Sequence, residues 1–105
     1  MYTIEWTLRA ELTYEAEINF ILLKEWPFKE VEKFIALVED KIQLLRAGTI
    51  TGKTSSIEDV RILVISKQTS LAYKIFEDEL KIELLTFWNN TVEPRAYDDL
   101  SLIHI

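Results

Sequence analysis

The sequence contains no cysteine and a single histidine, His104. The absence of cysteine excludes disulfide bonds, thiolate zinc sites and cysteine nucleophiles. One histidine close to the C-terminus cannot form the core of a metal site, because such sites need several nitrogen, sulfur or carboxylate ligands. We therefore expect neither a metal nor a cofactor.

Long apolar runs are also missing. No apolar stretch reaches the roughly 18 residues that a membrane helix requires. Residues 1–6 lack the basic region followed by an apolar run that marks a signal peptide. We expect a cytoplasmic protein with no membrane partner.

Positive charge is scarce. The chain has 12 lysines and arginines against 18 aspartates and glutamates, which gives a net charge of -6. Binding to nucleic acid depends on lysines and arginines that neutralise phosphates. The charge balance disfavours a broad nucleic-acid surface but leaves a local basic patch open.

What is present is a globular pattern. With 105 residues, of which 49% are hydrophobic, the chain forms one domain, with a core over residues 2–94 and an apolar tail over residues 95–105. Three runs rich in β-branched and aromatic residues, at 60–65, 71–76 and 80–90, predict three antiparallel strands in succession. Residues 2–6 alternate apolar and polar side chains and predict a further strand.

Two helices are expected between the first strand and the other three. Thr7 is a suitable N-cap for a helix over residues 8–25, and the Trp26–Pro27 break separates it from a second helix over residues 28–47, which ends at Gly48. The second half of the first helix, residues 18–23, is apolar on nearly every side, so we expect it to contact more than one neighbour.

The predicted fold is therefore α+β, with a two-helix hairpin packed on one face of a four-stranded, mainly antiparallel sheet. The opposite face of the sheet stays open for function. The loop over residues 48–59 contains two glycines before a lysine, but their spacing is too short for a phosphate-binding loop, and the loop follows a helix rather than a strand. The tail is expected to dock on its own sheet or on another chain.

Several short stretches recur in this order in one known family. They are Trp6 before the first helix, the Glu25-Trp26 break, Glu32-Lys33-Phe34-Ile35, Val60-Arg61, Leu71-Ala72-Tyr73-Lys74-Ile75, and Phe87-Trp88-Asn89-Asn90 followed by Pro94. Together with the strand–helix–helix–strand–strand–strand order, they resemble the RelE/ParE superfamily of toxins from type II toxin–antitoxin systems, which includes plasmid stabilisation proteins.

The resemblance implies a toxin that a cognate antitoxin neutralises. Members of the superfamily either cut mRNA on the ribosome or poison DNA gyrase, and the nucleases use clustered cations with an aromatic or histidine proton carrier. By resemblance, Arg61, Arg95 and Tyr97 are the candidate catalytic residues of a metal-independent endoribonuclease. The chain departs from the nuclease pattern at Asn89-Asn90-Thr91, where arginine is expected.

Because of this departure, we rank a gyrase-type or decayed toxin first and ribosome-dependent mRNA cleavage second, so enzymatic activity is not expected. A non-toxic interaction domain on the same scaffold is a further alternative. DNA gyrase, the ribosome and a second copy of the chain remain open as partners beside the antitoxin. The candidate partner-binding residues are Lys53, Lys74, Trp88, Asn89, Asn90, Leu100 and Leu102.

Simpler interpretations accompany these assignments. Arg61 is suited to contact phosphate or an antitoxin carboxylate, or to pair with Glu83 across the sheet. Trp88, at the end of a strand, is most simply a core residue. We expect Glu11, Glu15 and Glu17 to form a solvated face of the first helix. The apolar residues 18–23 and 100–105 are a suitable landing site for an antitoxin.

Overall fold

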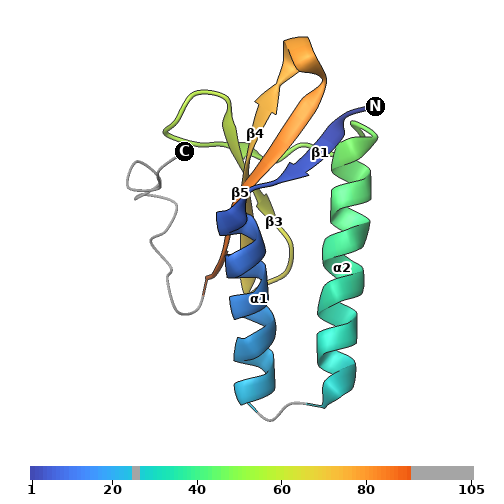
Figure 1. Cartoon of the computed structure of the whole chain (residues 1–105), viewed down its shortest axis with the longest axis vertical. Helices are drawn as coiled ribbons and strands as arrows, with labels where there is room; N and C mark the ends of the chain where they lie inside the picture. The colour runs from blue at the N-terminus through green and yellow to red at the C-terminus, as the bar shows by residue number, and fades with distance from the viewer. Residues whose placement is uncertain (25–26, 91–105) are drawn as a thin grey trace.

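The computed structural model of the protein describes residues 1–24 and 27–90. In this part of the chain, two helices pack on one face of a five-stranded mixed sheet (Figure 1). The elements in chain order are β1 (Thr3–Trp6), α1 (Leu8–Leu23), α2 (Phe28–Arg46), β2 (Lys53–Thr54), β3 (Val60–Val64), β4 (Thr69–Phe76), a short 3-10 helix η1 (Glu77–Glu79) and β5 (Lys81–Asn89).

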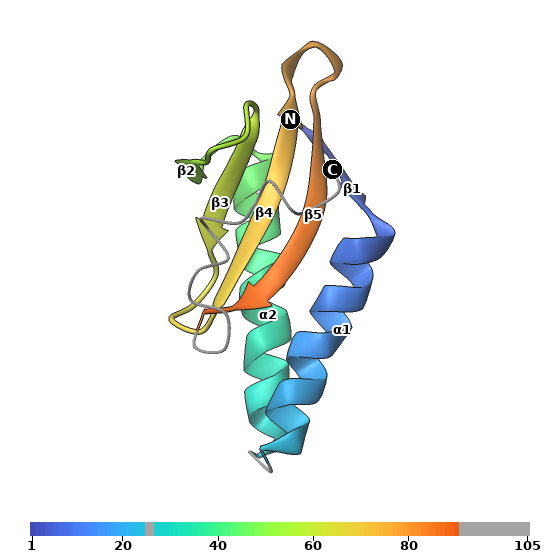
Figure 2. The same ribbon diagram turned by 90° about the vertical axis from the view of Figure 1, so that its left-hand side faces the viewer.

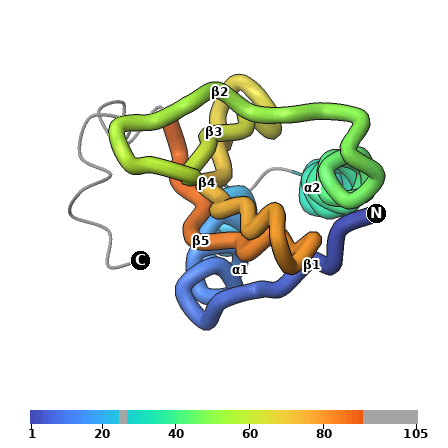
Figure 3. The backbone as a smooth tube through the Cα atoms, turned by 90° about the horizontal axis from the view of Figure 1, so that it is seen from above, coloured from blue at the N-terminus to red at the C-terminus, as the bar shows by residue number. Residues whose placement is uncertain are grey.

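The strands lie in the order β1-β5-β4-β3-β2. β1 runs parallel to β5, and all other neighbours are antiparallel. The α+β class and the helical hairpin on one face are confirmed, but the expected count of four strands is wrong. The additional strand, β2, is only two residues long, and two residues carry no periodic pattern that a sequence could reveal. It pairs with β3 at the edge of the sheet, where the loop from α2 arrives (Figure 3).

The predicted helix signals are confirmed. The Thr7 side chain accepts a hydrogen bond from the Ala10 N–H at 3.0 Å, as an N-cap does. At the other end of the hairpin, Gly48 adopts a positive φ of 74° and closes α2, a conformation that glycine reaches without the strain a Cβ brings. Both helices end slightly earlier than the sequence suggested.

Two threonines join α1 to β5. The Thr7 hydroxyl donates to the Leu84 carbonyl at 2.7 Å, and the Thr13 hydroxyl accepts from the Phe87 N–H at 2.9 Å. Between these two positions, the pairing of β4 with β5 shifts register after Ala72. A bulge leaves backbone groups outside the ladder, and the side chains of Thr7 and Thr13 bind the backbone on both sides of it.

When the sheet is viewed from its other face, α2 lies behind the strands and α1 lies beside β5 (Figure 2). Between the helices and the sheet is the main hydrophobic core, in which Tyr73 and Leu84 are fully buried. On the face away from the helices, a second and smaller apolar cluster follows β3, β4 and β5. Its buried members are Val60, Ile62, Ala72, Leu85 and Trp88.

Candidate functional site

Arg61 lies on the helix side of the sheet and not on its open face. In the pairing of β3 with β4 it is opposite Tyr73, whose ring belongs to the core beneath the helices. Side chains directly opposite each other share a face of the sheet. The Arg61 guanidinium donates to the Gly52 carbonyl at 3.2 Å. Arg61 is thus not paired with Glu83, which is opposite Lys74.

The cavity beside Arg61 is acidic. It has a volume of about 450 Å³, and Arg61 is the single cation among its described lining residues, against three carboxylates. The carboxylates are those of Glu58, Asp59 and Glu77. Carboxylates that line the same cavity oppose a phosphate there, because like charges repel strongly outside bulk water. The surroundings of Arg61 therefore favour a cationic or neutral group.

Lys53 and Lys74 lie on the other face. Lys53, on β2, is opposite Ile62, and Lys74, on β4, is opposite Val60. Ile62 and Val60 belong to the second cluster, away from the helices. The Lys74 ammonium lies 5.3 Å from the centre of the Phe76 ring, at a distance typical of a cation–π contact. The sheet thus separates Arg61 from both lysines.

The candidate residues at the end of β5 also lie on different faces of the sheet. Trp88 exposes 5% of its surface and belongs to the second cluster, whereas Asn89 is opposite Thr69 and faces the helices. Asn90 accepts a hydrogen bond from the Ser70 hydroxyl at 3.1 Å and donates to the Lys67 carbonyl at 3.5 Å. Arg95, Tyr97, Leu100 and Leu102 lie outside the described residues.

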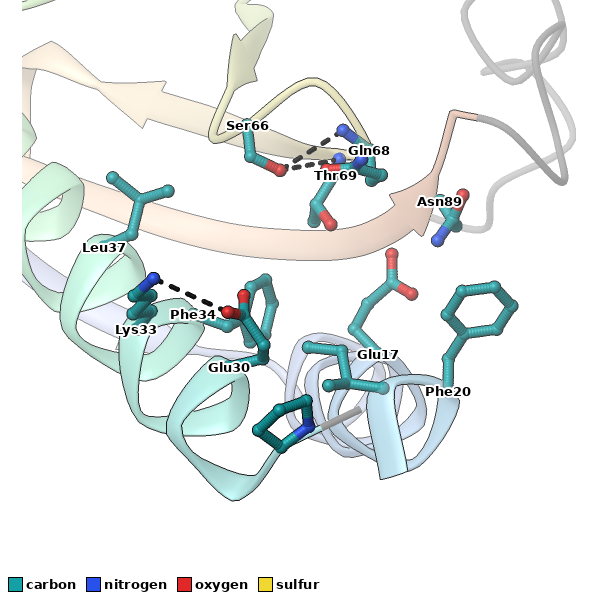
Figure 4. A pocket seen from close by; sticks show the side chains of 12 residues that line it. Glu17, Phe20, Glu30, Lys33, Phe34, Leu37, Ser66, Gln68, Thr69 and Asn89 are labelled. Carbon is teal, nitrogen blue, oxygen red and sulfur yellow. Dashed lines mark hydrogen bonds and ion pairs between the residues drawn. The ribbon is translucent and has the colours of Figure 1, made fainter. Parts of the chain in front are cut away.

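A second cavity, also of about 450 Å³, opens between the free end of the helical hairpin and the lower end of the sheet (Figure 4). Its walls combine apolar rings and aliphatic side chains with polar and charged groups. The lining residues are Glu17, Phe20, Ile21, Pro27, Glu30, Lys33, Phe34, Leu37, Ser66, Gln68, Thr69 and Asn89.

Glu17 is the residue of this cavity that sequence reasoning misplaced. It exposes only 7% of its surface, and Figure 4 shows its carboxylate turned toward Asn89. Glu11 and Glu15 are exposed, as expected, but the expectation of a solvated Glu17 is wrong. Its spacing from Tyr14 and Ile21 puts it on the face of α1 that meets the core, and that spacing was the available signal.

Two tyrosines have perturbed pKa values. The hydrogen bond that the Tyr2 hydroxyl donates to Glu77, 2.9 Å long, raises the pKa of Tyr2, and desolvation and the charge of Glu77 act in the same direction. Burial raises the pKa of Tyr14, and the charge of Glu39 adds to this. Neither residue lines either cavity, so these pKa values do not identify a proton carrier.

Within residues 1–24 and 27–90, no three histidine or carboxylate side chains come together as a metal site would require. The helices that the structure describes include none long and apolar enough to cross a bilayer.

No protein-family model matches the sequence. No curated protein matches it either. Solved structures do match. A chain of the chromosomal ParDE toxin–antitoxin system from P. aeruginosa superposes with a TM-score of 0.69 at 18% identity, over 85% of this chain and 96% of the other.

Two proteins from E. coli are similar as well. A chain of the DinJ–YafQ complex has a TM-score of 0.59 at 11% identity, over 88% of this chain and 97% of the other. The isolated RelE toxin has a TM-score of 0.52 at 14% identity, over 95% and 99%. Agreement over nearly the whole length of toxins from both branches shows that the chain has the RelE/ParE-like toxin fold.

Proposed function

We propose that the protein is the toxin of a type II toxin–antitoxin system and is held inactive by a protein antitoxin. The proposal is supported by the shared fold and by two of the similar structures, which are described as the ParDE system and the DinJ–YafQ complex. Fold alone does not fix function, so the argument also depends on the surfaces of this chain.

We further propose that the toxin acts by binding a protein target of the gyrase type and does not cut RNA. The observation that carries this proposal is the separation of the candidate cations. A nuclease without a metal needs several donors aimed at the phosphate where charge develops. Here Arg61 lines a cavity together with three carboxylates, and Lys53 and Lys74 lie on the other face of the sheet.

An antitoxin has an apolar landing site at the free end of the hairpin. Leu23 and Phe28, on either side of the break, expose 81% and 67% of their surfaces, and Leu22 exposes 46%. Large apolar side chains gathered in this way mark interaction surfaces, and an amphipathic or extended antitoxin segment is suited to cover them. Within the expected landing site, residues 18–23, Ile18 and Ile21 pack against the core, and Leu22 and Leu23 are exposed to a partner.

The test is induced expression in a bacterial host, with growth, mRNA integrity and plasmid supercoiling followed together. We expect growth arrest with altered supercoiling and intact mRNA. Arrest with mRNA cut at ribosome-occupied codons would show a nuclease and overturn the binding mechanism. Growth without arrest would leave a non-toxic interaction domain.

Charge-reversed variants locate the functional face. We expect Lys53→Glu combined with Lys74→Glu to abolish arrest, because both lysines share the face away from the helices. Lys29→Glu, an exposed lysine at the start of α2, is the matched control and should leave arrest unchanged. If Arg61→Glu leaves both arrest and antitoxin binding intact, Arg61 has no part in the functional face.

A further inference from the structure

The outward side of α1 carries a row of exposed apolar residues. Leu8 exposes 70% of its surface and Leu12 exposes 56%, and the row continues through Ala16 to Leu22 and Leu23. We call these five residues the α1 row. The other side of the helix carries the residues that pack into the core, which are Ala10, Tyr14, Ile18 and Ile21. α1 lies at the side of the molecule, beside β5 (Figure 2), and only one of its two apolar sides packs against other described elements.

α2 is the internal comparison. From Lys29 to Arg46, its exposed residues are polar or charged apart from Ala36. Single exposed apolar residues are ordinary on a protein surface. α1 instead gathers four exposed leucines on the outward side of a helix of 16 residues. Apolar residues gathered in this way are typical of an interaction surface and not of a solvated face.

The α1 row has the length and relief that suit another helix. From Leu8 to Leu23 it extends over about 22 Å, at a rise of about 1.5 Å per residue. Leucines stand at both ends, and the small Ala16 lies between them. A second helix can approach closely over a small side chain while its own side chains pack between the leucines. The row therefore fits an amphipathic helix of about four turns.

Charged residues border the α1 row. At 3.6 residues per turn, Glu11 and Glu15 lie along one border and Arg9 lies along the other. All three are exposed, and neither glutamate takes part in an ion pair between described residues. Charges at the rim of an interface set the specificity and orientation of the partner. A helix on this row should therefore carry lysine or arginine beside the two glutamates.

The same charges disfavour two other occupants. A second copy would meet the row around a two-fold axis near its middle, which brings the Glu15 carboxylates of the two copies close together. Each copy also has a net charge of -6. An anionic lipid surface attracts lysine and arginine and would repel the glutamates at the border.

We propose that the α1 row is the docking site of an amphipathic helix from a partner protein, with apolar side chains on the leucines and basic side chains beside Glu11 and Glu15. The identification of this partner as the antitoxin rests on the proposed function. The docking surface and the chemistry of its ligand do not depend on it. With an antitoxin as the partner, the apolar landing site at the free end of the hairpin extends along the whole of α1.

A displayed library of amphipathic helices of about four turns tests the chemistry, with either lysine or glutamate at the positions that flank a row of leucines. We expect the protein to enrich peptides with lysine on one flank. Glu11→Lys with Glu15→Lys should reverse this preference, with a change of roughly tenfold in the relative affinity for the two kinds of peptide.

Glu32→Lys with Asp40→Lys is the matched control. Both positions are exposed on α2, and the pair makes the same change in net charge. We expect this variant to keep the preference for lysine. Reversal in both variants would show that the peptides respond to total charge, and it would overturn the proposal. Failure to enrich any peptide would overturn it as well.

The enriched lysine peptide then locates the surface. Leu8→Gln with Leu12→Gln should weaken its binding by at least roughly tenfold, with the circular dichroism of the helices retained. Ala36→Gln, on the exposed side of α2, is the control and should bind as the wild type does. In nuclear magnetic resonance spectra, the peptide should shift the amide signals of α1 more than those of β3. Equal binding by the leucine variant would overturn the proposal.

The other occupants are tested directly. We expect the protein to sediment as a monomer and to stay in solution beside vesicles of phosphatidylcholine, with or without phosphatidylserine. A dimer or a vesicle-bound form that Leu8→Gln with Leu12→Gln abolishes would overturn the proposal. Growth assays enter none of these measurements. A protein without toxicity leaves the docking site in place, and a failed peptide selection leaves the toxin proposal in place.

Discussion

At the scale of single residues, Tyr14 illustrates how packing changes chemistry. Its ring lies 5.3 Å from that of Trp6, 5.4 Å from that of Phe87 and 5.8 Å from that of Phe34, measured between centres. In this apolar setting the phenolate is less favourable than in water, so the pKa of Tyr14 is raised, with Glu39 adding repulsion. The neutral ring therefore stabilises the fold more than the ionised ring does.

This has a consequence at alkaline pH. Because the pKa of Tyr14 is higher in the folded state, its contribution to the free energy of unfolding is complete below about pH 10, the ordinary value for tyrosine, and is lost as pH rises through the raised pKa. We expect stability to fall above that pH, and to fall less steeply in Tyr14→Phe. Denaturant unfolding at a series of alkaline pH values measures both slopes.

Part of the slope will remain in Tyr14→Phe, because the pKa of Tyr2 is raised as well. Tyr2→Phe separates the two contributions. Identical slopes in the wild type and in Tyr14→Phe would contradict the burial argument for Tyr14.

At the scale of elements, the two-residue strand β2 is held by Gly52. The Gly52 N–H donates to the buried Tyr73 hydroxyl at 2.7 Å, and its carbonyl accepts from Arg61. A Cβ at this position would overlap the carbonyl oxygen of Ile62 on β3. The short strand thus depends on a close backbone approach that only glycine permits.

We therefore expect Gly52→Ala to push β2 away from β3 and to lower the free energy of unfolding by about 1–3 kcal/mol, as overpacking does. Hydrogen exchange should accelerate in β2 and at the edge of β3. Gly48→Ala is the matched control, since its Cβ would meet only the Tyr2 ring at 3.8 Å and its strain comes from the positive φ. It should loosen the end of α2 and spare β2. Unchanged exchange in β2 of Gly52→Ala would refute the role of Gly52.

These elements also show what the sequence predicted. The sequence predicted the long elements because their apolar residues recur at a regular spacing and lie on one face. In α2 these residues are Val31, Phe34, Val38, Ile42 and Leu45. The sequence did not predict β2, because two residues are too few to show a periodic pattern. Its position depends on the Tyr73 hydroxyl, which is distant in sequence.

The candidate site was less accessible to sequence reasoning. The resemblance drew attention to Arg61, Lys53 and Lys74, but the face that each side chain occupies is set by register. A shift by one residue reverses every side chain of a strand. The resemblance to known toxins named the residues, and only the register separated Arg61 from the lysines.

At the scale of the whole molecule, negative charge dominates. The net charge is -6, and Glu58, Asp59 and Glu77 line the same cavity as Arg61. Non-specific binding of nucleic acid is almost entirely a matter of counterion release from phosphates by lysine and arginine. An acidic molecule whose candidate cations lie on two different faces of the sheet lacks that driving force.

We expect the isolated protein to bind single-stranded RNA more weakly than about 10⁻⁴ M at physiological salt, measured by fluorescence anisotropy. Glu58→Lys with Glu77→Lys should gain binding, because the new cations adjoin Arg61. Glu11→Lys with Glu15→Lys makes the same change in net charge on the exposed face of α1 and is the control. An equal gain in both pairs would show that total charge matters and the neighbourhood of Arg61 does not. Tight binding by the unmodified protein would contradict the charge argument.

The parallel pairing of β1 with β5 has a consequence for the timing of synthesis. Thr3 pairs with Lys81 and Trp6 with Leu84. β1, which is synthesised before the other described strands, therefore has no partner until β5 has been made. A chain is made from its N-terminus, and the sheet of this protein cannot close on a nascent chain that lacks β5. The sheet therefore closes only after β5 has been made, and until then β1 lacks its neighbour in the ladder.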